Sequence, residues 1–292
     1  MKGYALYTGC LIYSRLPHLE AVSTKVLHKL GLRAERLEGF TCCPEPTAMR
    51  VLSQRAWYAL AARNLAVAEE AGLNVLTLCN GCNATLFRVN EDLRRDEGLR
   101  GRVNEDLKAV GRRYGGGVEV RSILRAIYED VGLEALRGAA VRALRGVKVA
   151  LHHGCHIYDE LSRFDDVAEP KSFKAVVNAL GCEVVDYASE GLCCAAFIRP
   201  VDEELSLTFV REKVEDAVKA GADCMVVICP TCLIQLDVGQ VAASRKLKAK
   251  LELPVLYLTQ LMGLSMGMTL DEVGFKYHSV RGGRLAEGLM KA

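Results

Sequence analysis

Short apolar runs alternate with longer segments of helical periodicity along the whole chain. Strands are expected over Tyr4–Tyr7, Arg33–Leu37, Val75–Leu78 and Val118–Val120, and again over Val147–Leu151, Glu183–Tyr187, Met225–Ile228 and Val255–Leu258. Helices are expected over Leu11–Leu30, Ala48–Ala71, Ala84–Val110, Ile123–Tyr128, Lys171–Leu180, Glu203–Lys219 and Cys232–Ser244. Short apolar strands bounded by helices are typical of βαβ units. The pattern therefore predicts an α/β fold in which a mainly parallel sheet is flanked by helices.

The second half of the chain repeats the first. Residues 5–10 are Ala-Leu-Tyr-Thr-Gly-Cys and residues 150–155 are Ala-Leu-His-His-Gly-Cys, and each is followed by a Cys-Cys pair and then by a Cys-x-x-Cys motif. Because cysteine is a rare residue, its recurrence in the same order indicates a tandem duplication. We therefore expect two duplicated domains, residues 1–132 and 146–292, related by pseudo-twofold symmetry and joined by the segment between them.

Length and charge exclude several classes of protein. A chain of 292 residues suits two domains of ~100–200 residues each. Its 38 basic and 36 acidic residues leave a net charge of +2, which gives no reason to expect a nucleic-acid partner. No apolar run approaches the ~20 residues of a membrane span, and the N-terminal apolar stretch is too short for a secretory signal. We expect a cytoplasmic protein without direct membrane insertion.

Twelve cysteines are the unusual feature of the composition. Without an export signal, metal ligation or redox chemistry is a better interpretation than structural disulfides. The repeated cysteines are Cys10, Cys42, Cys43, Cys79 and Cys82 in the first half and Cys155, Cys193, Cys194, Cys229 and Cys232 in the second. They follow the expected strands, so each half gathers its thiols at the carboxyl edge of its sheet. Cys182 and Cys224 have no counterparts and are expected to be buried, inert thiols.

The number of thiols in each half helps to select the metal centre. Structural zinc takes four ligands, and neighbouring cysteines rarely occupy one such site together. A cubane iron–sulfur cluster also needs only four cysteines. Five thiolates suit a larger or opened iron–sulfur cluster, whereas zinc and unligated buried thiols remain the alternatives.

The spacing C-x(31)-C-C-x(35)-C-x-x-C, followed by C-x(37)-C-C-x(34)-C-x-x-C, resembles the tandem cysteine-rich CCG domains of the B subunit of CoB–CoM heterodisulfide reductase. The resemblance implies that each motif binds a noncubane [4Fe-4S] cluster, described as fused [3Fe-4S] and [2Fe-2S] parts, with the ten repeated cysteines as ligands. Zinc in place of the first cluster is the alternative. One departure is that Pro44 and Ala195 stand where the motif has its glycine.

The resemblance also implies a reaction and partners. The chain would be the catalytic subunit of a CoM-S-S-CoB-type reductase of methanogenesis, cleaving a small-molecule disulfide to two thiols. Electrons would come from a ferredoxin protein with cubane clusters, similar to the family's C subunit, which is fed by a flavin-bearing protein similar to its A subunit. The sequence has no dinucleotide or Walker fingerprint, so an external electron source is expected. The alternative is an electron-relay or sulfur-transfer subunit of a related sulfur-oxidising or succinate/fumarate reductase complex.

Three histidines, His152, His153 and His156, surround Cys155. We predict that His153 and His156 are catalytic, because an imidazole there can give a proton to a departing thiolate or hydrogen-bond a cluster sulfur. The alternative is that they only pack beside the ligands.

Other residues near the motifs have weaker signals. Gly9 and Gly154 are expected to allow close approach to the site. Asn80 and Asn83 either hydrogen-bond sulfide or cap a helix. Candidate anion-binding residues are Arg15, Arg50, Arg55, Arg163 and Arg199.

Overall fold

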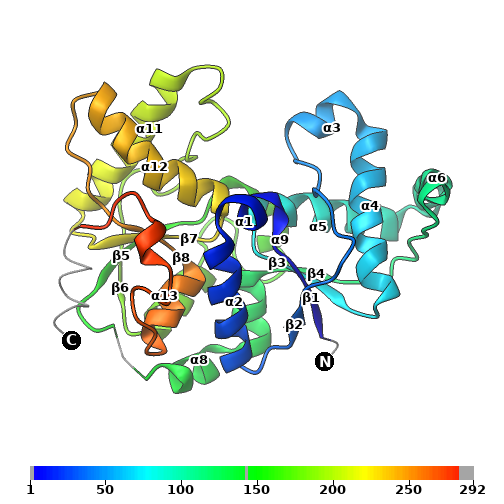
Figure 1. Ribbon diagram of the computed structural model, residues 1–292, viewed down its shortest axis with the longest axis horizontal. Coiled ribbons are helices and arrows are strands. Elements are labelled where there is room, and N and C mark those ends of the chain that lie inside the picture. The colour runs from blue at the N-terminus through cyan, green and yellow to red at the C-terminus, as the bar shows by residue number, and fades with distance from the viewer. Residues whose placement is uncertain (1–2, 142–143, 283–292) are drawn as a thin grey trace.

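The structure is a computed structural model that describes residues 3–141 and 144–282 (Figure 1). Each half contains a four-stranded, all-parallel sheet, and the strand orders are β2-β1-β3-β4 and β6-β5-β7-β8. The strands of the first sheet are β1 (Tyr4–Tyr7), β2 (Ala34–Glu35), β3 (Asn74–Thr77) and β4 (Val120–Ser122). Those of the second are β5 (Lys148–His152), β6 (Glu183–Val185), β7 (Cys224–Val227) and β8 (Val255–Tyr257). The predicted pair of duplicated α/β units is confirmed.

The central strands carry the apolar runs because they are covered on both faces. All residues of β1 and β7 are buried. In the first sheet Ala5 of β1 is paired with Val75 of β3, and in the second Ala150 of β5 is paired with Met225 of β7. Equivalent strands therefore end at equivalent places, which sets the positions of the motifs that follow them.

Helices connect the strands and flank the sheets (Figure 1). In the first half they are α1 (Gly9–Arg15), α2 (Pro17–Lys29), α3 (Ala48–Leu52), α4 (Gln54–Glu70), α5 (Asn80–Arg95), α6 (Glu97–Leu107) and α7 (Ile123–Arg125). A connecting helix, α8 (Leu133–Ala139), precedes α9 (Tyr158–Leu161), α10 (Ser172–Ala179), α11 (Glu203–Lys219), α12 (Pro230–Lys246) and α13 (Leu258–Ser265). Short helical turns lie at Lys108–Val110, Ala126–Val131, Cys155–Ile157 and Phe275–Tyr277.

Three of the long predicted helices are divided. The helix expected over Leu11–Leu30 breaks at Leu16, because a residue before proline avoids the helical conformation and Pro17 instead begins α2. The helix expected over Ala48–Ala71 breaks at Ser53. This residue has an extended backbone, and its hydroxyl accepts a hydrogen bond from the backbone N–H of Ala56 and so caps α4.

The third division and the missed helices have similarly local causes. Asp96 ends α5 and caps α6 by accepting a hydrogen bond from the backbone N–H of Leu99, which divides the segment Ala84–Val110. Helix α13 was not predicted, because every one of its residues is buried and it shows no polar face. Helices α8 and α9 are too short to give a periodic signal. Helix α8 lies within the predicted connection, and the boundaries 1–132 and 146–292 remain predictions.

The two halves are packed together through buried contacts. Helix α2 of the first half packs against α13 of the second, where the hydroxyls of Ser23 and Thr259 are 2.8 Å apart (Figure 1). The hydroxyl of Tyr257 donates to the carbonyl oxygen of Leu78 at 2.7 Å. A continuous apolar core includes residues from both sheets. No helix in the described part of the chain is both long and apolar enough to cross a membrane.

Glu160 is a buried carboxylate that links the halves. It belongs to α9 of the second half, and both its oxygens accept a hydrogen bond from the backbone N–H of Ser122 at 3.1 Å. The side-chain amide of Asn83 donates to it at 2.8 Å, and a guanidinium nitrogen of Arg125 is 3.7 Å away. Burial raises the pKa of Glu160. These first-half groups hold the segment that follows Cys155.

Removing this carboxylate is expected to weaken the whole chain. Glu160→Ala leaves the Asn83 amide and the Ser122 N–H without their acceptor, so we expect the free energy of unfolding to fall by about 3 kcal/mol. Asp159→Ala, at the neighbouring, more exposed position, is the matched control and should change it by less than about 0.5 kcal/mol. Denaturant unfolding of the full chain measures both, and equal effects would contradict the role given to Glu160.

Candidate metal centre

One cavity of about 250 Å³ gathers the repeated cysteines of both halves. Its lining includes Cys10, Cys42, Cys43, Cys79, Cys82, Cys155, Cys193, Cys194, Cys229 and Cys232. All twelve cysteines of the chain are free thiols. The structure therefore brings the ten predicted ligands together at one place. The two unrepeated cysteines, Cys182 and Cys224, are buried as predicted and do not line the cavity, and burial raises the pKa of both thiols.

Equivalent elements position equivalent cysteines. Cys79 and Cys229 have nearly the same extended backbone, at φ −138° and −137°, and directly precede α5 and α12. Cys82 and Cys232 lie in the first turns of these helices, where the helix dipole favours a thiolate. Without a metal, hydrogen bonding with Cys43 and Cys194, respectively, and burial raise the pKa of both thiols. The Cys-x-x-Cys motifs are thus held at helix N-termini.

The loop that carries the first cysteine pair is braced by two buried, neutral side chains and by one partly exposed cation. The side-chain amide oxygen of Asn64 accepts from the backbone N–H of Thr41 at 2.8 Å, and its amide nitrogen donates to the carbonyl oxygen of Cys42 at 3.0 Å. The hydroxyl of Tyr7 donates to the carbonyl oxygen of Thr41. A guanidinium nitrogen of the partly exposed Arg63 also donates to the carbonyl oxygen of Gly39 at 2.6 Å.

The loop that carries the second pair is braced by a buried cation. The ammonium group of Lys213 donates to the carbonyl oxygen of Ser189 and, at 3.2 Å, to that of Glu190. Lys213 is only 1% exposed, and burial lowers its pKa to about 8. The hydroxyl of Ser206 donates to the carbonyl oxygen of Ala195 at 2.9 Å.

The two loops differ at the position of the motif glycine. Ala195 has a positive φ of 62°, a left-handed conformation that costs a residue with a side chain about 1 kcal/mol. Its N–H donates to the Cys193 sulfur at 3.3 Å. Pro44 cannot adopt a positive φ, because its ring fixes φ near −65°. The second loop therefore keeps the conformation that glycine favours, and the first does not.

The thiols of each half touch one another and perturb each other's protonation. Hydrogen bonding from Cys42, and next from Cys82, lowers the pKa of Cys43 to about 5. Across the two halves, interaction with Cys229 raises the pKa of Cys79. Thiols held this close together release their protons when a metal binds them as thiolates.

Gly9 and Gly154 show the predicted close approach. Both have positive φ, at 73° and 74°. A Cβ atom built on Gly9 would lie 2.8 Å from the sulfur of Cys82, whereas one built on Gly154 would lie 3.5 Å from that of Cys232. The first of these distances leaves no room for a side chain.

The predicted histidines have different surroundings. His156 lines the cavity, and its ring centroid is 6.4 Å from that of Phe197. His153 does not line the cavity, since its Nδ1 is 3.6 Å from a carboxylate oxygen of Glu190 and its ring packs edge-on against Phe173. Burial lowers the pKa of His153 to about 4.

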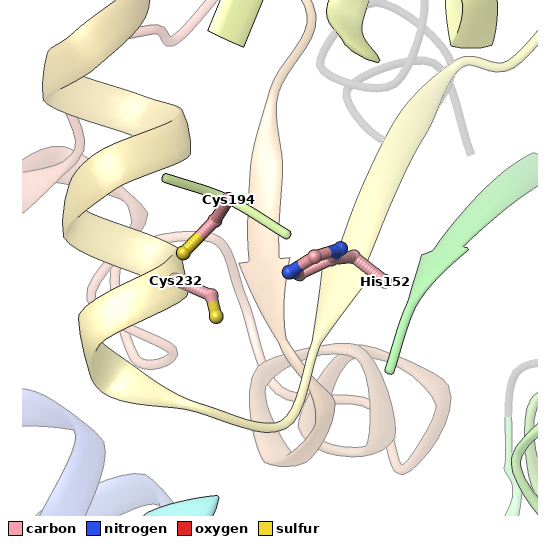
Figure 2. A group of neighbouring side chains, drawn as sticks. All are labelled: His152, Cys194 and Cys232. Atoms are coloured by element: carbon pink, nitrogen blue, oxygen red, sulfur yellow. The ribbon is translucent and has the colours of Figure 1, made fainter. Parts of the chain in front are cut away.

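His152 is the residue that the sequence did not single out. Figure 2 shows its ring directed toward the sulfurs of Cys194 and Cys232, and the three ligand atoms lie within 4.8 Å of one another. The side chain is 1% exposed, and neither ring nitrogen has a hydrogen-bond partner among the described residues. Burial lowers its pKa to about 3, so the ring is neutral. Its place as the last residue of a buried strand was the available signal.

The other candidates are engaged elsewhere. The side-chain amide of Asn80 donates to the carbonyl oxygen of His153 at 2.8 Å, and that of Asn83 donates to Glu160, so both brace the halves. None of the five candidate arginines lines the cavity. Arg55 pairs with Asp106, Arg163 with Glu91 and Arg199 with Glu203, while Arg50 lies over Trp57.

The donor set fits an iron–sulfur centre in each half. Five thiols converge in each group, more than one tetrahedral zinc ion accepts. Three of each five are buried, and two, namely Cys10 and Cys42 or Cys155 and Cys193, are exposed at the rim. A single zinc ion would instead suit the smaller group of His152, Cys194 and Cys232. That group lies in the second half, whereas the sequence placed the zinc alternative in the first.

Comparisons with known proteins agree with this site. The chain matches the family of CCG cysteine-rich domains over residues 4–87 and 149–237. It is 34% identical to the B subunit of the ferredoxin/F420H2-dependent CoB–CoM heterodisulfide reductase of Methanosarcina acetivorans, over 96% of this chain and 95% of that protein. A protein of Archaeoglobus profundus, described as similar to the heterodisulfide reductase B subunit, is also 34% identical, over 94% and 93%.

Two further relatives extend the comparison. The membrane anchor subunit of the 8-methylmenaquinol:fumarate reductase of Wolinella succinogenes is 31% identical, over 96% of this chain and 97% of that protein. The crystal structure of a hypothetical protein from Helicobacter pylori superposes with a TM-score of 0.75 at 17% identity. The superposition covers 96% of this chain and 52% of that protein. This likeness concerns the fold alone.

The unequal space at the two glycines gives a test of the site. Alanine at either position is strained by the positive φ, at about 1 kcal/mol, but only Gly9→Ala also displaces a ligand sulfur. We expect Gly9→Ala to lower the iron bound per chain after anaerobic reconstitution, and Gly154→Ala to retain it with a similar loss of thermal stability. Equal iron content in the two variants would contradict the crowding inferred at Cys82.

Proposed function

Because this chain belongs to the CCG cysteine-rich domain family that includes the B subunit of heterodisulfide reductase, we propose that it is the catalytic iron–sulfur subunit of such a reductase. Its substrate would be a small-molecule disulfide of the CoM-S-S-CoB type. The observation that carries the proposal is that both five-thiol groups line one cavity. A single substrate placed in that cavity would face both groups at once.

In this proposal each half holds a noncubane [4Fe-4S] cluster on its five repeated cysteines. When bound, the two clusters supply the electrons for reduction. Cleaving one disulfide bond takes two electrons and two protons and gives two thiols. A chain with two equivalent sites on one cavity matches that requirement, whereas a single site would have to be reduced twice for each substrate.

The cavity selects the part of the substrate that enters. Its volume of about 250 Å³ is already smaller than the ~300–1,000 Å³ of pockets that enclose drug-sized ligands, and two clusters bound to the lining cysteines would occupy part of it. Leu11, Phe197 and Pro230 contribute apolar lining that excludes water around the sulfurs. We propose that the disulfide enters the cavity and that the charged ends of the substrate remain outside it.

His156 is the residue that we propose as proton donor. The sequence favoured both His153 and His156, but only His156 of the pair lines the cavity. Its Nδ1 would be 3.8 Å from a Cβ atom built on Gly81, so the ring lies against the Cys-x-x-Cys motif of the opposite half. From there it can reach a sulfur that leaves either group.

The electrons are proposed to come from another protein. The relatives named as ferredoxin-dependent enzymes support a ferredoxin as electron donor. We propose that it carries cubane clusters and is similar to the family's C subunit. That partner would be fed in turn by a flavin-bearing protein similar to the A subunit. The cytoplasmic location predicted from the sequence is part of the same proposal.

A second candidate is favoured by the fumarate reductase relative at 31% identity. In that case the chain would be an electron-relay or sulfur-transfer subunit of a related complex. Purified, cluster-loaded protein separates the two when CoM-S-S-CoB is offered with an artificial one-electron donor. Turnover supports the catalytic role, and its absence with both clusters intact supports the relay.

The metal content tests the cofactor assignment. Anaerobically purified chain should contain roughly eight irons, or two four-iron clusters. About four irons with one tightly bound zinc would instead show that one half is a zinc site. If the zinc is in the first half, Cys194→Ser should lose the iron of the second half and keep the zinc. If the zinc is bound through His152 in the second half, His152→Ala should lose the zinc and keep the iron.

Replacing His156 tests the proton donor. With iron content and EPR spectrum unchanged, His156→Gln should lower disulfide turnover about tenfold or more, because a general acid contributes ~10²–10⁴-fold. His153→Gln is the matched control and should retain most of the activity, since its ring faces Glu190. A larger loss in His153→Gln than in His156→Gln would reverse the assignment.

A further inference from the structure

The two sites differ in charge at equivalent positions. Asn64 and Lys213 are each the eleventh residue of α4 and α11, the helices that brace the two cysteine-pair loops. Both side chains are about 1% exposed, and both donate to backbone carbonyls of their loop. One is a neutral amide, and the other is an ammonium ion. The second site therefore has a buried positive charge that the first lacks at this position.

The charge of Lys213 acts at the second group of thiols. Its ammonium donates to the carbonyl oxygens of Ser189 and Glu190, in the loop that carries Cys193 and Cys194. In keeping with this position, the charges of Cys194 and Cys232 oppose the effect of burial on the pKa of Lys213. Lys213 in turn adds to burial in lowering the pKa of His152, whose ring lies beside the same two sulfurs. A charge without access to water is weakly screened, so its effect on a nearby centre is large.

The last residue of the first strand in each sheet gives a second difference. Tyr7 ends β1, and its hydroxyl donates to the carbonyl oxygen of Thr41. His152 ends β5, and its nitrogens have no protein partner among the described residues but face the sulfurs of Cys194 and Cys232 (Figure 2). A neutral imidazole carries one N–H donor, and a hydrogen bond to a cluster sulfur raises the reduction potential.

Carboxylates near the two sites also contribute to the local charge. Glu45 lines the cavity two residues after the first cysteine pair, and Ala196 occupies the equivalent position in the second half. Glu190 is near Lys213 and opposes its charge, but this side chain is 29% exposed. Solvent screens Glu190 more than the buried ammonium. At the first site Arg63 donates to the carbonyl oxygen of Gly39, the counterpart of Glu190, but this side chain is also partly exposed and is screened by solvent. The buried ammonium of Lys213 is the less screened positive charge, so the second site is the more electropositive of the two.

We propose that a cluster held by the second-half cysteines is reduced at a higher potential than one held by the first-half cysteines, because Lys213 and His152 stabilise the added negative charge. This inference rests on the proposed function, since it requires an iron–sulfur cluster in each half. Its consequence is that the two halves are not interchangeable electron donors: the first electron to arrive is held in the second half.

An EPR-monitored redox titration of the full, cluster-loaded chain tests the inference. Two one-electron waves are expected, and Cys232→Ser should remove the wave at higher potential while Cys82→Ser removes the other. Lys213→Gln keeps an N–H donor for the carbonyl oxygens but removes the charge. It should shift the reduction equilibrium of the higher wave about tenfold toward the oxidised form, which is about 59 mV for one electron. Lys213→Arg, which keeps the charge, should leave that wave near its original position.

The possible outcomes are distinct. The inference is overturned if the two waves coincide or if the wave at higher potential belongs to the first half. It is also overturned if Lys213→Gln keeps its full iron content and neither wave moves. If Lys213→Gln loses its second-half iron, Glu45→Gln decides the question: it should raise the lower wave and narrow the gap, and an unchanged gap overturns the inference. A chain that binds no cluster at all refutes the proposed function instead, and iron analysis shows this before any titration.

Discussion

The need to hold many thiols together in a nearly dry space is the constraint on which the rest of the structure depends. Thiolates repel one another, and burial makes each of them costly unless a metal centre or hydrogen-bond donors compensate. Parallel strands offer a solution, because their carboxyl ends meet at one edge and the following helices present N–H groups there. The duplicated sheets use this edge twice, and the shared cavity joins the two edges into one site.

Joining the edges also makes the halves structurally dependent on each other. Asn80 and Asn83 follow Cys79 and flank Cys82, yet their amides bind His153 and Glu160 of the second half. Residues that adjoin ligands in one half thus position ligands in the other. The continuous core has the same effect at larger scale. Each half contains its own sheet, but the cavity exists only when the two are docked.

The sequence predicted the features that depend on the spacing of apolar residues and on the positions of the cysteines. The parallel sheets, the duplication and the convergence of ten cysteines follow from short apolar runs and from where cysteines stand relative to them. Helix α13 escaped because burial on all sides removes the polar face. The direction of the histidine side chains could not be predicted in the same way. Neighbouring residues at the end of a strand point to opposite faces, so His152 faces the sulfurs and His153 faces Glu190. Sequence proximity to Cys155 could not distinguish them.

The left-handed backbone of Ala195 has a consequence for how the two copies diverged. In the second half the position accepts glycine or a small residue, and a β-branched one would be strongly disfavoured there. In the first half Pro44 commits the chain to the opposite sign of φ, so the loop after Cys43 must follow another path. Because the two loops now have different backbone conformations, a substitution that one loop tolerates need not be tolerated at the equivalent position of the other. The duplicated ligands stayed the same in kind, while their surroundings became free to specialise.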